Sequence, residues 1–104
     1  MSPRIPSPLP GTVVSVEEQY IFSATALCRA TGARADQLSA LVGEGVLHPI
    51  GGPDEDWQFA DQALPRTLTA LRLARDFDLA PAGVALVMDL LDEIERLRAR
   101  QRRG

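Results

Sequence analysis

The stretch that decides the fold is residues 22–47, FSATALCRATGARADQLSALVGEGVL. Ser23 is a suitable N-cap, because its hydroxyl can accept a hydrogen bond from a backbone N–H of the first helical turn. The helix that it begins is predicted to run to about Ala30. Gly32 then provides the stop, because glycine readily adopts the left-handed conformation in which helices end.

A second short helix is predicted over residues 35–43, with Gly45 ending it. Its apolar residues recur at the three- and four-residue spacing of one helical face: Leu38, Leu41 and Val42. Two short amphipathic helices joined by a tight turn that contains glycine are typical of a helix-turn-helix.

Short strands are expected on both sides of this unit. Residues 12–16 and 20–22 are rich in β-branched and aromatic residues, which favours strands before the first helix. After the second helix, residues 46–50 and 56–59 flank a segment rich in turn residues, which predicts a small β-hairpin, or wing. The expected fold class is therefore all-α with a small β-wing, followed by two longer helices.

The third helix is expected to begin with Asp61 as its cap and to run to about Phe77. Its main apolar stripe is predicted to comprise Leu64, Leu68 and Leu71. Leu73 and Phe77 form a second apolar edge, so we expect this helix to be covered on more than one side.

The fourth helix can run unbroken from Pro81 to about Arg103, since proline is tolerated in a first turn. Between Val84 and Leu91 its apolar residues surround the axis, so this part is predicted to be buried on all sides. Asp92 and Arg96 are spaced for an ion pair. Further along, the spacing resembles a short coiled coil and predicts a homodimer through Val87, Leu90, Leu91, Ile94 and Leu97.

Composition excludes several function classes. Cys28 is the only cysteine and His48 the only histidine, so neither an internal disulfide nor a Cys/His metal cluster can form, which favours the cytoplasm. No nucleophile motif or glycine-rich phosphate loop is present, so we expect no enzyme activity and no cofactor. Residues 1–10 are rich in proline and are expected to form a disordered tail, neither signal peptide nor membrane span, before a single domain over residues 11–104.

The charge distribution favours a protein partner over nucleic acid. Five of the eleven arginines lie at residues 96–103, so the first 95 residues carry six arginines against fourteen acidic groups, a net charge of −8. Phosphate backbones are bound mainly by Lys and Arg, so an acidic body with an acidic wing suits them poorly. The predicted contact residues for a basic partner are Asp54, Glu55, Asp56 and Trp57. Trp57 could instead close the small core beneath the wing.

Residues 22–91 resemble the MerR-type winged helix-turn-helix, and within it the CbpM group of chaperone modulators. The features that carry the resemblance are Phe22, Leu27-Cys28, Thr31-Gly32, Leu38, Val42, Gly45-Val46, Pro49, Trp57-Gln58-Phe59, Asp61, Arg72-Leu73 and Leu86 to Leu91. The chain departs from DNA-binding MerR regulators where they place an arginine and a tyrosine, since Ala40 and Leu41 stand there.

This resemblance implies a bacterial protein that binds the J-domain of a DnaJ-like co-chaperone of the CbpA type and keeps it from delivering clients to DnaK. J-domains carry a basic helix that docks on DnaK, and an acidic body could compete for that helix. The alternative is a MerR-like DNA-binding transcriptional regulator, which would bind duplex DNA with a steep salt dependence. A structural subunit of an unrelated complex is a third, weaker interpretation.

Overall fold

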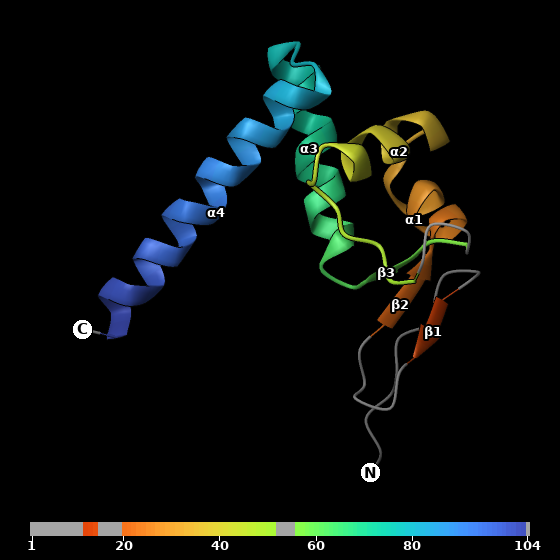
Figure 1. The fold of residues 1–104 in the computed structure, drawn as a ribbon, viewed down its shortest axis with the longest axis horizontal. Helices are drawn as coiled ribbons and strands as arrows, with labels where there is room; N and C mark the ends of the chain where they lie inside the picture. The colour runs from red at the N-terminus through yellow and green to blue at the C-terminus, as the bar shows by residue number, and fades with distance from the viewer. Residues whose placement is uncertain (1–11, 15–19, 52–55, 104) are drawn as a thin grey trace.

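The computed structural model describes residues 12–14, 20–51 and 56–103. The predicted tail at residues 1–10 lies outside them. The described chain is mostly helical with a small sheet, as the fold class predicted (Figure 1). Its elements are β1 (Thr12–Val14), β2 (Tyr20–Ser23), α1 (Ala24–Thr31), α2 (Ala35–Gly43), β3 (Gln58–Ala60), α3 (Ala63–Phe77) and α4 (Pro81–Arg103).

The ends of α1 and α2 form where the sequence predicts them. Ser23 accepts a hydrogen bond from the Ala26 backbone N–H at 3.0 Å, and this caps α1. Gly32 ends α1 with φ of 81°, and Gly45 follows α2 with φ of 79°. Both positions require the left-handed conformation that glycine adopts without steric cost. The two helices contact each other and form the predicted helix-turn-helix.

The sheet is antiparallel, with β2 between β1 and β3. The two flanks of the predicted wing do pair, through one antiparallel bridge between Ile50 and Gln58, and β3 also pairs with β2, which the sequence did not predict. The physical reason is the core, because the pairing of Phe22 with Phe59 buries both rings. The strand predicted at residues 12–16 is β1 over its first three residues, and residues 15 and 16 lie outside the described chain.

Helix α3 faces the core mainly with small side chains, and of the predicted leucine stripe only Leu64 packs against the core. Its buried residues are Ala63, Thr67 and Ala70. Of the predicted set, Leu68 is 48% exposed, while Leu64 and Leu71 are half-buried. Alanine-sized residues let a helix approach its neighbours closely, and α3 contacts both α1 and α4.

Both ends of α3 also differ from the expectation. The residue before the helix is Gln62, which has helical backbone angles and makes no side-chain cap, so the predicted Asp61 cap is wrong. Asp61 contributes its backbone carbonyl instead, which accepts a hydrogen bond from the Leu64 N–H at 3.2 Å. Along the predicted second edge Leu73 is half-buried against the core, whereas Phe77 at the far end is 68% exposed, so this edge is covered only in part.

Thr67 is the buried polar side chain on the core face of α3. It is 0% exposed, and its hydroxyl oxygen has no hydrogen-bond partner among the described residues. A buried hydroxyl without a partner loses its hydrogen bonds to water on folding. We expect Thr67→Val, which keeps the shape of the side chain, to raise the free energy of unfolding by about 1 kcal/mol.

Urea denaturation of the two proteins measures this difference. Thr69→Val is the matched control, because Thr69 is only half-buried on the same helix, and it should leave stability nearly unchanged. Destabilisation by Thr67→Val would mean that the hydroxyl is hydrogen-bonded in solution.

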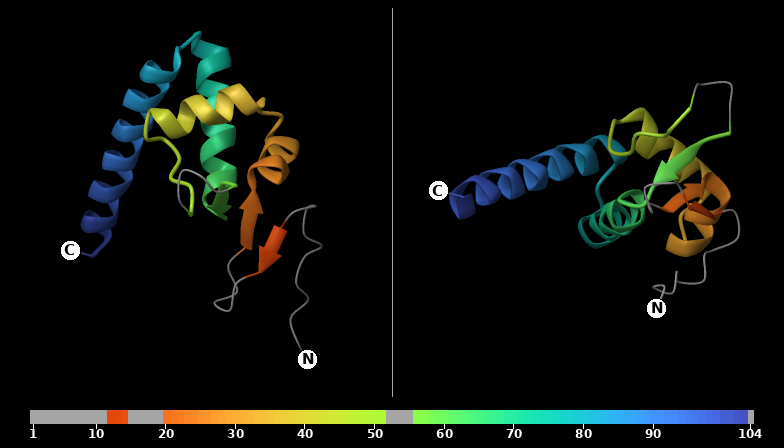
Figure 2. Two further views of the ribbon diagram at one scale, coloured as in Figure 1. Left: turned by 45° about the vertical axis from the view of Figure 1, so that its right-hand side comes forward. Right: turned by 90° about the horizontal axis from the view of Figure 1, so that it is seen from below.

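Helix α4 runs from Pro81 to Arg103, as predicted, and diverges from α3 along its length (Figures 1 and 2). Val84 and Met88 are buried against the body, and α4 contacts α3 and α2. The prediction that residues 84–91 are buried on all sides is wrong for the single chain, since Leu86 is 62% and Leu90 56% exposed. The body is too small to surround the helix, so the C-terminal half of α4 projects away from it.

Candidate protein-binding site

Trp57 lies just before β3 and is fixed from two directions. Its backbone carbonyl accepts a hydrogen bond from the Ala24 N–H, the first residue of α1, at 3.2 Å. Its ring meets the buried Phe59 ring edge to face, with centroids 6.2 Å apart and an interplanar angle of 81°. The side chain is half-buried and packs against the core, so one part of the indole closes the core while another remains accessible.

The accessible part of Trp57 lines a shallow groove of about 400 Å³ with residues of α1 and α2. Ala24, Cys28 and Leu38 make its wall apolar. Burial raises the pKa of the Cys28 thiol, so this side chain is neutral at physiological pH and behaves as apolar surface. The groove therefore suits an apolar side chain of a partner.

The charged residues near Trp57 are of both signs. Asp56 is exposed beside Trp57, and Arg29 of α1 lines the groove. The other two predicted contact residues, Asp54 and Glu55, lie outside the described residues. The sequence pointed to Trp57 and Asp56, which are adjacent in the chain, but it contained no local signal that Cys28 and Leu38 would join them.

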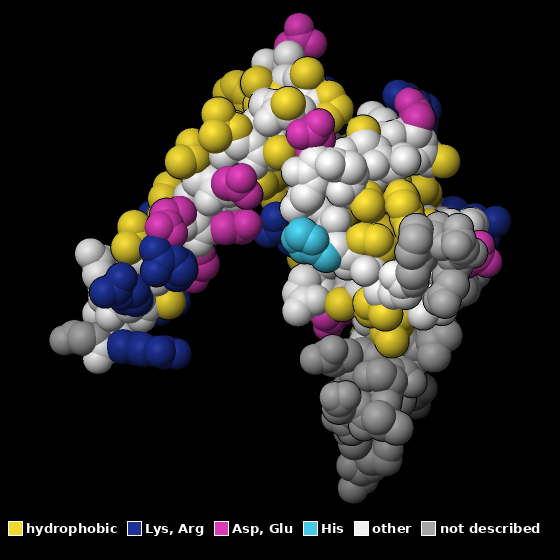
Figure 3. Space-filling view, viewed as in Figure 1, with side chains coloured by type: hydrophobic (Ala, Val, Ile, Leu, Met, Phe, Trp, Pro, Cys, Tyr) yellow, Lys and Arg dark blue, Asp and Glu magenta, His cyan; other side chains and the backbone are white. Residues whose placement is uncertain are grey.

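A second exposed surface follows α4. Its outer edge carries large apolar side chains, while acidic groups and then arginines occupy other parts of the helix (Figure 3). Of the five predicted dimer residues, Val87 is half-buried and the other four are exposed by 43–56%: Leu90, Leu91, Ile94 and Leu97. Val87, Leu90, Ile94 and Leu97 recur at three- and four-residue spacing, which places them on one face of α4.

Arg66 of α3 links the helix-turn-helix to α4. Its Nε donates to the Val46 carbonyl oxygen at 3.1 Å, and its Nη1 lies 2.8 Å from Oδ1 of Asp92. The predicted Asp92–Arg96 ion pair is therefore wrong: Asp92 pairs with Arg66, and Arg96 pairs with Glu93 through Nε and Oε2 at 2.8 Å. The sequence could not indicate this, because Arg66 lies on a different helix.

The described residues contain no group of three or more His, Cys, Asp or Glu side chains that could hold a metal ion. In the same part of the chain, none of the helices combines the length and apolarity that a membrane crossing requires.

Comparison with known proteins agrees with this architecture. Residues 22–103 match the family described as MerR HTH family regulatory protein. The proteins named "Chaperone modulatory protein CbpM" from Salmonella paratyphi B (strain ATCC BAA-1250 / SPB7), Salmonella newport (strain SL254) and Salmonella heidelberg (strain SL476) are each 38% identical over 81 residues, which cover 78% of this chain and 80% of each relative. The chain belongs to the CbpM group of the MerR helix-turn-helix family.

The second helix of this MerR-type unit has few groups free to contact bases. The Arg34 guanidinium pairs with Asp36 at 3.0 Å and holds the pKa of that carboxyl below its usual range. Gln37 accepts a hydrogen bond from the Arg34 N–H at 2.9 Å. Ser39 is exposed on α2 and Glu44 is exposed directly after it, so the exposed side chains of this helix are mostly short and nearly neutral or acidic.

Proposed function

We propose that the chain is a non-enzymatic chaperone modulator that binds the J-domain of a DnaJ-like co-chaperone of the CbpA type and inhibits it. The observation that carries the proposal is the 38% identity to proteins named chaperone modulatory protein over 78% of the chain. In this function the chain occupies the J-domain surface that otherwise docks on DnaK. The proposed compartment is the cytoplasm, and nucleic acid is not part of the proposed complex.

Charge and shape of the Trp57 surface support a basic partner. The first 95 residues carry a net charge of −8, and Asp56, which precedes Trp57 in the chain, is exposed. The J-domain, as the resemblance implies, presents a basic helix. An amphipathic helix with basic residues can place an apolar side chain against Trp57 and its cations near Asp54, Glu55 and Asp56. Complementary charge adds to the association rate and to specificity.

The proposed assembly is a homodimer through α4. The apolar face of α4 is exposed over Leu90, Ile94 and Leu97, and its spacing fits a two-stranded coiled coil. A row of exposed large apolar residues on a projecting helix is unfavourable in water. Pairing with a second copy removes this surface from solvent, and none of the residues that line the Trp57 groove belongs to α4.

The acidic segment is tested by charge reversal. Changing Asp54, Glu55 and Asp56 together to lysine is expected to weaken J-domain binding by about 1 to 3 kcal/mol and to reduce its salt dependence, because attraction becomes repulsion. Calorimetry with the isolated J-domain at two salt concentrations measures both effects. The inhibition itself is read from the J-domain-stimulated ATPase activity of DnaK, which the unaltered chain should suppress.

The control is the same charge change elsewhere. Glu44, Asp61 and Asp89 are exposed acidic residues away from the Trp57 groove, and their combined change to lysine should preserve most of the affinity. Equal losses from both triple variants would indicate general attraction instead of a site. Failure of the unaltered chain to bind the J-domain would contradict the proposed function.

A further inference from the structure

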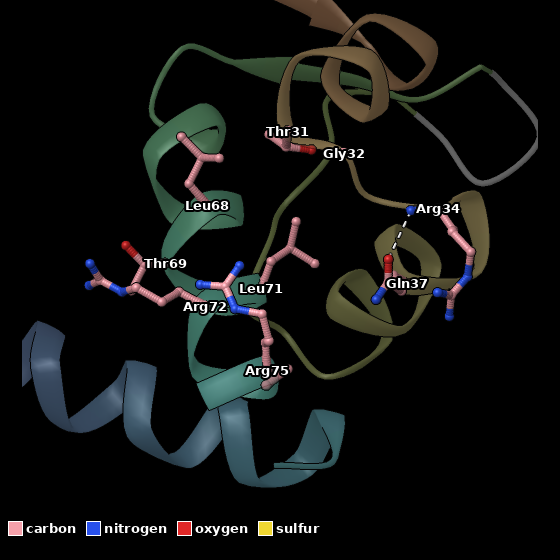
Figure 4. A pocket seen from close by; sticks show the side chains of 10 residues that line it. Thr31, Gly32, Arg34, Gln37, Leu68, Thr69, Leu71, Arg72 and Arg75 are labelled. Carbon is pink, nitrogen blue, oxygen red and sulfur yellow. Dashed lines mark hydrogen bonds between the residues drawn. The ribbon is translucent and has the colours of Figure 1, made fainter. Parts of the chain in front are cut away.

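A different groove lies between the turn of the helix-turn-helix and α3 (Figure 4). Its volume is about 710 Å³. Thr31, Gly32, Arg34 and Gln37 form one wall, and residues of α3 form the other. This groove shares no lining residue with the groove beside Trp57, so the two are separate surfaces.

The α3 wall is apolar at its base. Leu71 points into the groove toward Thr31 (Figure 4), and Leu68 lines it while 48% exposed. Both leucines belong to the stripe that was predicted to face the core. An exposed leucine on a concave surface gains free energy when a partner's apolar side chain covers it, at about 25 cal/mol for each Å² removed from water.

Three arginines line the groove: Arg34, Arg72 and Arg75. The Arg34 side chain is 69% exposed in its pair with Asp36, and that of Arg75 is 73% exposed in its pair with Asp76 at 3.0 Å. Arg72 has no hydrogen-bond or ion-pair partner among the residues that the structure describes. Exposed pairs of this kind contribute only about 0–1 kcal/mol. Incoming carboxylates can therefore replace the chain's own acidic partners at little cost.

The opposite wall is held rigid by the helix-turn-helix turn. The Thr31 hydroxyl donates to the Leu27 carbonyl oxygen at 2.8 Å and accepts from the Ala33 N–H at 3.2 Å. Gly32 has no side chain, and no other atom lies within 4 Å of the position a Cβ would take. The groove is thus open beside a fixed backbone, and a preformed surface lowers the ordering cost of binding.

We propose that this groove is a second protein-binding surface, which takes an acidic segment carrying an apolar anchor. The anchor rests on Leu68 and Leu71, and flanking carboxylates bind Arg72 and Arg75. A guanidinium matches a carboxylate with two parallel hydrogen bonds. Nucleic acid fits less well, because the groove offers the exposed apolar surface of Leu68 and Leu71, from which a phosphate backbone gains nothing. The chain would then join a basic partner on one surface to an acidic partner on another.

The test is an NMR titration of the full chain with the acetylated, amidated peptide Glu-Asp-Leu-Glu-Glu-Leu-Asp-Glu. Saturable shifts are expected at the amides of Thr31, Gly32, Leu68 and Leu71. The double variant R72E/R75E should weaken binding at least about tenfold, because two attractive contacts become repulsive. A peptide with Gln and Asn in place of the acids should bind at least about tenfold more weakly as well.

The matched control is R100E/R103E, which makes the same charge change at the exposed C-terminal end of α4 and should leave the affinity unchanged. An equal loss in this control overturns the proposal, and so does the absence of saturable shifts in the groove. Tighter binding of a short DNA duplex at the same amides would assign the groove to nucleic acid instead. R72E/R75E should also bind the J-domain as tightly as the unaltered chain does. If this variant loses J-domain binding, the two grooves do not act as separate binding surfaces.

Discussion

The double variant L90E/I94E should be a monomer at concentrations where the unaltered chain is expected to form the proposed dimer. Both side chains are exposed on the apolar face of α4, and the proposed dimer interface would bury them against a second copy. Pairing would then place four glutamates in an apolar interface, and each uncompensated buried charge is strongly unfavourable. We expect a loss of about 4 kcal/mol or more, which corresponds to a dimer Kd raised roughly a thousandfold. Analytical ultracentrifugation over a concentration series measures it.

The matched control is Asp89→Lys, which also changes the charge by two units on the same helix. Asp89 is exposed and lies off the row formed by Val87, Leu90, Ile94 and Leu97. The substitution Asp89→Lys should therefore leave the proposed dimer intact. If the unaltered chain remains monomeric at micromolar concentration, the proposed dimer does not form. If L90E/I94E is still a dimer, the interface lies elsewhere on the chain.

Phe59→Ala should destabilise the folded chain strongly. The ring is 0% exposed, pairs across strands with Phe22 and contacts Trp57 edge to face. Its removal leaves a cavity in the core, with an expected loss of about 3–5 kcal/mol in the free energy of unfolding. Because a domain of this size has only about 5–15 kcal/mol in total, the melting temperature should fall sharply.

Phe77→Ala is the control, since it makes the same substitution at a site that is 68% exposed. Its effect should stay within about 0.5 kcal/mol. Thermal melts followed by circular dichroism compare the two variants. A similar loss in both would mean that Phe77 is covered in solution, and a mild effect of Phe59→Ala would contradict the position of β3 in the core.

Local signals predicted the helices well. Ser23, Gly32 and Pro81 act through their own backbone and nearest neighbours, so their capping and starting roles follow from residue type. Predictions that depended on distant partners were weaker. The spacing of Leu64, Leu68 and Leu71 is as regular as that of Ala63, Thr67 and Ala70, so periodicity alone could not tell which face α1 and α4 would cover.

The residues of the two grooves show the same difference between local signals and distant packing. Trp57 and Asp56 stood out because tryptophan is enriched among the residues that dominate protein interfaces, and this one is the only tryptophan and follows acidic residues in the chain. The groove wall formed by Cys28 and Leu38, and the arginine-lined groove on α3, depend on how separate helices pack. No spacing rule within one helix indicates such neighbours.

Arg66 donates hydrogen bonds to both Val46 and Asp92, and so it connects α4 to the rest of the fold at Asp92. About 17 Å of helix extends beyond that residue, so a tilt of only about 10° moves the tip by roughly 3 Å. In the proposed dimer, such a tilt would change the distance between the two Trp57 grooves, and the hydrogen bonds of Arg66 would oppose it.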